Sequence, residues 1–351
     1  MSATTLFDGI VQHTVTTPRL TANVLERPGG DRTIVFVHGN CSSSLFWQPA
    51  MLALPADIRA LAIDLRGFGD SDVLPVDASR GVRDYSDDIE AVVNALGLES
   101  FGLVGWSLGG GVVMQYVLDH PERVNLLGLV SPVSPYGFGG TAANGSLLDP
   151  AAPGTGGGGA NPDFVARLAA GDTTDEAPTS PRTVFRTAYV KHPENHTEWE
   201  DIWVASMLTT ATGIDNYPGD SVAVEAWPGF GPGTRGVLNT LAPTNFNTTA
   251  IVDLAVKPPV LWFRGADDAI VSDTSFFDLN FLGQVGAIPG WPGVDVAPAQ
   301  PMVSQTRSVL DRYAARGGSY EEIVYEETGH STPIERTSEF AAALAHRLPA
   351  A

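Results

Sequence analysis

The chain has 351 residues, of which 43% are hydrophobic and 17% charged, so it has ample apolar material for a large core and is not wholly disordered. Forty acidic against twenty basic side chains give a net charge of −20, which argues against nucleic-acid and membrane-surface partners because both are anionic. The single cysteine, Cys41, excludes an internal disulfide.

The N-terminal third alternates short apolar strands with amphipathic helices. Residues 1–10 carry neither the basic nor the apolar region of a secretory leader, so we expect a cytoplasmic protein. The residues before Asp31 predict an antiparallel hairpin at a sheet edge. Strands are expected over residues 33–37, 60–63, 101–104 and 126–130, and helices over residues 86–96 and 109–118. This alternation is typical of βαβ units around a mostly parallel sheet.

The alternation stops after Ser131. Residues 137–159 contain nine glycines in twenty-three positions, which predicts a mobile surface loop. Helical patterns follow over residues 164–170, 182–190 and 199–210. We therefore predict an inserted cap, or lid, over residues 132–256.

The strand and helix pattern returns with a strand over residues 260–263. A helix over residues 305–315, a strand over residues 322–325 and a helix over residues 335–347 complete it. Residues 1–131 and 257–351 are thus predicted to form one α/β core domain of ordinary size, interrupted by the cap.

The run Gly105-Trp106-Ser107-Leu108-Gly109 lies between a predicted strand and a predicted helix. A serine in such a sharp turn has strained backbone geometry, and the small glycines on either side make room for it. Its hydroxyl would stand exposed at the carboxyl edge of the sheet, where it could act as a nucleophile. The alternative is a glycine-rich turn whose serine only caps the helix.

A serine nucleophile needs a base and a group that orients the base. His330 follows the last predicted strand, and its loop returns to the same sheet edge as Ser107. Asp267 and Asp268 follow the strand over residues 260–263, and we expect Asp268 to be the acid because it lies farther past the turn. The chemistry further requires donors for the developing oxyanion, and the backbone N–H groups of Asn40 and Leu108 are the natural pair.

Two other groups could suggest different chemistry. Cys41 lies beside the oxyanion turn, but no elbow surrounds it, so we interpret it as a packed thiol. His192 and His196 are four residues apart, but Pro193 between them disfavours a regular helix. We therefore predict no metal site.

The order Ser107, Asp268, His330, with His38-Gly39-Asn40 and the run DLRGFGDS at residues 64–71, resembles the α/β-hydrolase superfamily. Within it, the glycines after the elbow are similar to the esterase, lactonase and cofactor-free perhydrolase branch. This resemblance covers about residues 20–131 and 257–347. It implies a doubly wound, mostly parallel eight-strand sheet, a cap after the sixth strand, and no cofactor. The segment after His38 also resembles the haloalkane dehalogenases, which need an aspartate nucleophile in place of Ser107.

These observations lead to the hypothesis of a serine hydrolase that cleaves a carboxylic ester or lactone, with a bulky, largely apolar small-molecule substrate. Trp106, Phe46 and Trp47 are expected to bind substrate. Aromatic residues of the cap and of the following excursion either line an apolar pocket or form the cap's own core: Trp199, Trp203, Trp227, Phe230, Phe276, Phe277 and Trp291.

The alternatives are an amide, peptide or carbon–carbon bond hydrolase with the same triad, or a ligand-binding relative with weak catalysis. Whether the chain forms homo-oligomers is left open by the sequence.

Overall fold

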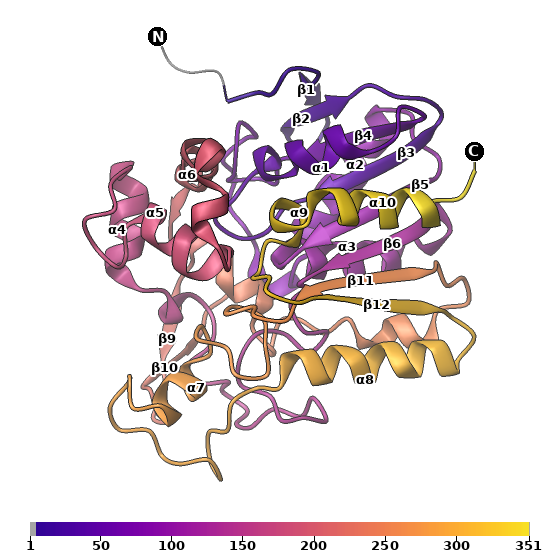
Figure 1. Ribbon diagram of the computed structural model, residues 1–351. Coiled ribbons are helices and arrows are strands. Elements are labelled where there is room, and N and C mark those ends of the chain that lie inside the picture. Colours follow the sequence, from indigo (N-terminus) through magenta and orange to yellow (C-terminus); the bar gives the residue numbers. More distant parts are fainter. Residues whose placement is uncertain (1–4, 351) are drawn as a thin grey trace.

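The computed structural model describes residues 5–350. The first four of the ten N-terminal residues considered in the sequence analysis lie outside the described residues. An eight-stranded sheet with the order β1-β2-β4-β3-β5-β6-β11-β12 runs through the molecule (Figure 1). Its strands are β1 (Val11–Thr16), β2 (Thr21–Arg27), β3 (Arg32–Val37), β4 (Ile58–Ile63), β5 (Phe101–Trp106), β6 (Val124–Val130), β11 (Val260–Gly265) and β12 (Tyr320–Tyr325).

The pairing confirms the predicted mostly parallel sheet. Strand β2 is antiparallel to both β1 and β4, so the N-terminal hairpin lies at the edge, and the pairs from β4 to β12 are parallel. From β3 the chain first adds β4 on one side and then crosses to add β5 on the other side. The loops that follow β3 and β5 therefore meet at a topological switch point, where α/β sheets form their ligand sites.

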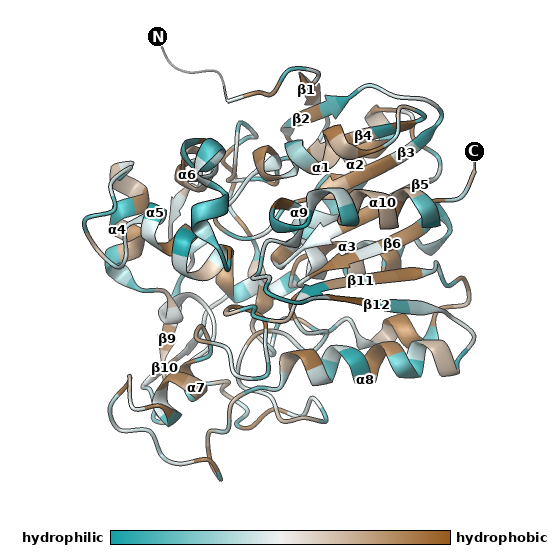
Figure 2. Ribbon diagram, in the orientation of Figure 1, coloured by the Kyte–Doolittle hydropathy of each residue, from teal (hydrophilic) through white to brown (hydrophobic). Residues whose placement is uncertain are grey.

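Helices cover both faces of this sheet. Helix α1 (Gln48–Ala53) packs against α10 (Thr337–Arg347), and α2 (Arg83–Ala95) packs against α3 (Leu108–Asp119). Figure 1 shows these two pairs on opposite faces, and α8 (Met302–Ala315) beside β12. Because both faces are covered, the inner strands are continuously apolar; β3 and β11 are mainly brown in Figure 2.

A long connection joins β6 to β11. It contains α4 (Pro162–Ala170), α5 (Pro181–Val184), a π-helical turn (Phe185–Tyr189) and α6 (Glu200–Leu208), followed by the short strands β7 (Thr212–Gly213), β8 (Tyr217–Pro218), β9 (Ser221–Ala223) and β10 (Phe230–Pro232). Figure 1 shows α4, α5 and α6 gathered at one end of the sheet. Residues 132–256, called the cap segment below, form most of this connection. The division into two domains stays a prediction.

The glycine-rich stretch over residues 137–159 differs from its prediction as a surface loop. Thr141, Ala152 and Thr155 within it are buried, and the N–H of Gly157 donates to Asn239 Oδ1 at 3.1 Å. A Cβ on Gly157 would lie 2.5 Å from a neighbouring backbone oxygen. Parts of this stretch therefore pack against other segments, because glycine here allows close approach, while other parts are exposed. The mobility of the stretch stays a prediction.

Two short helices, α1 and α7 (Leu279–Gln284), escaped the sequence analysis, since six residues are too few for a helical period to stand out. Within residues 5–350, none of the helices has the length and apolar character that crossing a bilayer requires. The cytoplasmic location stays a prediction.

Candidate active site

Ser107 lies in the sharp turn between β5 and α3, with φ 58° and ψ −118°. This backbone conformation is costly for a residue with a side chain, and the surrounding contacts must hold it. A Cβ on Gly105 would lie 2.2 Å from the backbone oxygen of Gly109, and a Cβ on Gly109 would lie 2.4 Å from the backbone oxygen of His38. Both glycines are therefore required by close backbone contacts, and they pack the start of α3 against the end of β3.

His330 and Asp268 form a buried pair. The distance from His330 Nδ1 to Asp268 Oδ2 is 2.8 Å, and each side chain is only 2% exposed. The other carboxylate oxygen of Asp268 accepts the N–H groups of Ile270 at 2.8 Å and Val271 at 2.9 Å. These three hydrogen bonds fix the orientation of the carboxylate. The imidazole is therefore held with Nδ1 towards Asp268, and its Nε2 is free to face another group.

Asp267, the alternative acid, lies elsewhere. Its side chain is exposed and forms an ion pair with Lys191, with 3.0 Å between Lys191 Nζ and Asp267 Oδ1. The structure thus brings Asp268, and not its neighbour, to His330.

Ser107 and His330 line the same cavity, which has a volume of about 380 Å³. Asn40 and Leu108 line it too, so the four predicted site residues other than the acid border one cavity. Most of the remaining wall is apolar, and it includes Val133, Phe138, Phe164, Val184, Leu238, Leu241, Ile270, Val271, Phe276, Phe277, Leu279 and Leu282. An apolar cavity with a few convergent polar groups is the usual form of a small-molecule site.

The turn that carries Asn40 is held by a buried histidine. His38 Nε2 accepts the N–H of Leu65 at 3.0 Å, while Nδ1 lies 2.8 Å from the backbone oxygen of Gly39 and donates to it. Burial lowers the pKa of His38, so the ring is neutral and can accept and donate in this way. Cys41, which follows Asn40, has a φ of 46°, and such a positive φ is unusual for a residue other than glycine.

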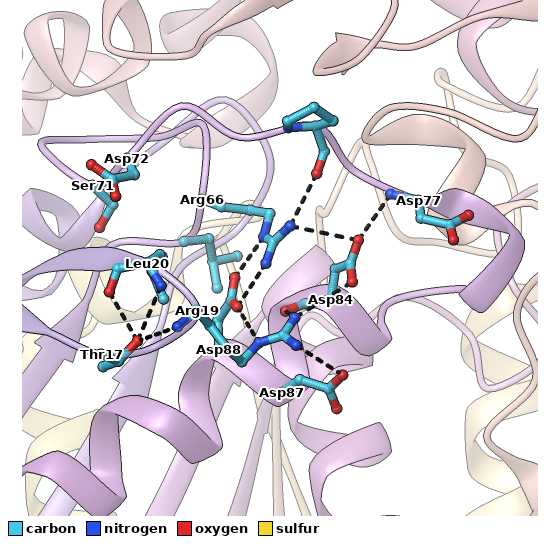
Figure 3. A network of polar contacts seen from close by, with 12 residues as sticks. Thr17, Arg19, Leu20, Arg66, Ser71, Asp72, Asp77, Asp84, Asp87 and Asp88 are labelled. Atoms are coloured by element: carbon cyan, nitrogen blue, oxygen red, sulfur yellow. Dashed lines mark hydrogen bonds and ion pairs between the residues drawn. The ribbon is translucent and has the colours of Figure 1, made fainter.

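A charged network fixes the neighbouring loop after β4 (Figure 3). Arg66 donates to both oxygens of Asp88 on α2, at 2.6 and 2.7 Å, and Arg19 donates to the same carboxylate at 2.7 Å. Such a bidentate pair fixes orientation as well as distance. Leu65, the residue before Arg66, donates its N–H to His38, so the network anchors the chain next to the partner of that histidine.

The residues expected to bind substrate do not line the cavity. Trp106, Phe46 and Trp47 are at most 2% exposed and lie in the core beneath it. The Phe46 and Trp106 rings are 5.2 Å apart, and Trp106 Nε1 donates to the backbone oxygen of His330 at 3.0 Å. Their observed role is to pack and to hold the His330 loop. This corrects the prediction: the three side chains belong to the buried core, and none of them lines the cavity.

Of the seven aromatic residues of the cap and the excursion, Phe276 and Phe277 line the cavity. Trp203, by contrast, is fully buried and packs on Phe46 at 5.2 Å. Cys41 lines the cavity as a buried thiol, and burial raises its pKa to about 12, so it is neutral near pH 7.

Comparison with known proteins shows what the fold is similar to. A family model described as the α/β hydrolase fold matches residues 32–155. Carboxylesterase YbfK of Bacillus subtilis is 31% identical over 104 residues, which are 30% of this chain and 35% of that protein. The putative carbamate hydrolase RutD of Caulobacter is 36% identical over 105 residues, 30% of this chain and 39% of that protein. These matches therefore span little more than a third of each curated relative.

Solved structures match over nearly the whole chain. An esterase from Exiguobacterium antarcticum has a TM-score of 0.59 at 16% identity, covering 96% of this chain and 99% of that one. The enol-lactonase of Burkholderia xenovorans LB400 has a TM-score of 0.57 at 15% identity, covering 96% and 99%. At these identities the likeness shows the fold alone. Together with the family model over residues 32–155 and the observed sheet, it shows that the chain has the α/β-hydrolase fold.

Proposed function

We propose that this chain is a serine hydrolase that cleaves a carboxylic ester or lactone through an acyl-enzyme intermediate. One observation carries the proposal: a histidine bonded to a buried carboxylate lines the same cavity as a serine in a strained strand-to-helix turn. A nucleophile, a base and a group that orients the base are the parts that acyl transfer requires.

In this mechanism Ser107 Oγ attacks the substrate carbonyl carbon while His330 Nε2 takes the hydroxyl proton. The N–H groups of Asn40 and Leu108 bind the oxyanion that forms. The carbon–oxygen bond to the leaving group then breaks, and His330 returns the proton to the departing alcohol oxygen. A water molecule, which gives its proton to His330, then attacks the acyl-serine ester, and His330 returns that proton to Ser107 as the acid is released. Asp268 stabilises the imidazolium in both steps.

The apolar wall supports a bulky, largely apolar substrate. The cavity volume of about 380 Å³ lies within the range of pockets that hold drug-sized molecules. Relatives and structural neighbours named as a carboxylesterase and an enol-lactonase favour an ester or a lactone as the bond cleaved. The name of the putative carbamate hydrolase makes a carbamate the first alternative to include in a substrate panel.

Replacing the nucleophile tests the proposal. Ser107→Ala should lower kcat on p-nitrophenyl esters by at least roughly 10⁴-fold, because no other group can form the acyl ester. It should also abolish labelling by a fluorophosphonate probe, while circular dichroism stays that of the native fold. Ser338→Ala, which changes an exposed serine on α10, is the matched control and should leave both readouts unchanged.

Retention of turnover or labelling in Ser107→Ala would refute the assignment. A native protein that fails to label would favour the ligand-binding alternative. Turnover of amides or carbamates without esters would keep the triad and change the substrate class.

A further inference from the structure

Tyr189 is a buried side chain for which the mechanism above has no role. It ends the π-helical turn Phe185–Tyr189 in the cap segment, is 6% exposed and lines the cavity. Its ring lies edge-on to His330, with 6.2 Å between ring centroids, and edge-on to Trp106 at 5.8 Å. Wide helical turns of this kind are frequent at functional sites because they shift one side chain out of register.

The hydroxyl of Tyr189 is bonded to the turn that carries the oxyanion donor. It lies 3.0 Å from the backbone oxygen of Asn40 and 3.3 Å from that of Cys41, and donates its proton between them. These carbonyls lie on either side of the positive φ of Cys41. A strained turn persists only when its surroundings hold it, and this hydroxyl is a contact that does so. Burial raises the pKa of Tyr189 well above its usual value, so the group stays a donor.

The backbone of the same segment is bonded to the loop that carries His330. Tyr189 accepts the N–H of Ser331 through its backbone oxygen at 2.9 Å. Two residues on, the N–H of Lys191 donates to Glu335 Oε2 at 2.7 Å, and Oε1 of that carboxyl accepts the N–H of Gly329 at 2.8 Å. Both chain neighbours of His330 are therefore tied to this part of the cap segment.

We propose that Tyr189 is a positioning residue that fixes the Asn40 turn relative to His330, so that the cap segment sets the geometry of the oxyanion site. It is one side chain in contact with two loops that leave the sheet at β3 and β12, far apart in sequence. This inference rests on the proposed function, since it assigns a task within that mechanism. A tyrosine that merely packed would need its ring but not its hydroxyl.

The experiment removes the hydroxyl and keeps the ring. Tyr189→Phe should lower kcat on p-nitrophenyl esters by between about 10-fold and 100-fold, less than the roughly 10²–10³-fold loss of an entire oxyanion donor. KM should change by less than about twofold, because the ring still lines the cavity and misplacement acts mainly in the transition state. The rate of fluorophosphonate labelling should fall with kcat, since the probe uses the same oxyanion site.

Tyr313→Phe is the matched control. Tyr313 is also buried, and its hydroxyl donates to the backbone oxygen of Pro258 at 2.5 Å, away from the cavity. Both variants lose one buried bond from a tyrosine to a carbonyl, so both should lower Tm by a similar small amount. Only Tyr189→Phe should lower kcat.

Equal kcat values in native protein and Tyr189→Phe would overturn the positioning role, as would a rise in KM alone or equal kcat losses in the two tyrosine variants. In each case ester turnover by the native protein would leave the proposed function standing. If the native protein turns over no ester and does not label, the proposed function fails, and the role of Tyr189 fails with it.

Discussion

Asp267 and Asp268 are neighbours in the chain, yet their carboxylates face different partners. Asp268 is buried against His330, whereas Asp267 is exposed and paired with Lys191. The sequence ranked Asp268 first from its place past the turn but could not settle the choice, because the path of the turn depends on tertiary contact. A Cβ on Gly265 would lie 2.1 Å from the backbone oxygen of Gly329, so this turn is shaped by the His330 loop.

The two aspartates provide a paired test at the residue scale. Asp268→Asn should lower kcat by about 10⁴-fold, because an amide in place of the carboxylate favours the wrong imidazole tautomer and does not stabilise the imidazolium. Asp267→Asn removes only a half-exposed ion pair and should change kcat by less than about twofold. Steady-state kinetics on one p-nitrophenyl ester would measure both. Similar losses in the two variants would contradict the assigned acid.

At the scale of elements, the long strands and helices of the core were predictable and the cavity wall was not. The strands β3 to β6 and β11 are mainly apolar runs bounded by turn residues, and the helices α2 and α8 carry a clear apolar period, so local pattern suffices for them. The edge strand β12 contains two glutamates and is marked only by its last residues, Ile323 to Tyr325. The wall is built from short pieces, such as α7 and residues 138–161, whose pattern is set by the segments they touch. The sequence shows where glycines occur in this wall, but it does not show which segments pack against them, so their role in close packing could not be predicted.

Gly159 offers a way to test how these short pieces control access to the cavity. It lines the cavity and is exposed, and a Cβ there would meet only the backbone oxygen of Gly154 at 3.6 Å and Leu279 Cδ1 at 4.0 Å. Gly159→Phe should therefore fold and fill space near the opening. We expect kcat/KM for bulky aryl esters to fall by about tenfold or more, and that for p-nitrophenyl acetate to stay within about twofold.

Ala170→Phe, at the exposed end of α4, is the control for adding an aromatic side chain to the same region of the surface. A uniform loss across all esters in Gly159→Phe would mean that the substitution disturbs the catalytic groups. If the ratio of kcat/KM for bulky aryl esters to that for p-nitrophenyl acetate does not change, substrate does not reach Ser107 past residue 159.

For the molecule as a whole, the convergence of three distant residues was predictable and the shape of the site was not. In a parallel sheet, the loops after β5, β11 and β12 leave from one edge, so Ser107, Asp268 and His330 had to approach one another. The cavity depends on how the cap segment packs over that edge, and no periodicity encodes such packing. The role of Tyr189 could not be predicted from the sequence, because its hydrogen-bond partners are backbone atoms of loops far away in the chain.

Glu335 links the stability of the whole chain to pH. Burial raises its pKa from the usual 4.5 to about 7, against the opposing effect of the N–H groups of Lys191 and Gly329. The folded chain then binds this proton more tightly than the unfolded chain, so the free energy of unfolding falls as pH rises from about 4.5 to about 7. A titrating carboxyl can contribute at most about 1.4 kcal/mol per pH unit in this window.

Glu335→Gln removes the titration, so the difference in free energy of unfolding between native protein and variant should decline across that window and be flat below it. Urea unfolding at several pH values would measure it. Glu339→Gln, an exposed carboxyl on α10, is the control and should give a constant difference. A constant difference for Glu335→Gln would show that its environment does not favour the proton.

Positions in this protein differ in how much substitution they tolerate during evolution. The close approach of Gly109 to β3 leaves no room for even a methyl group, so most substitutions at the elbow would be eliminated for their effect on folding before any effect on chemistry mattered. Near Gly159 a new side chain meets little resistance. Descendants of this sequence would therefore diverge in what they accept long before they diverge in how they react.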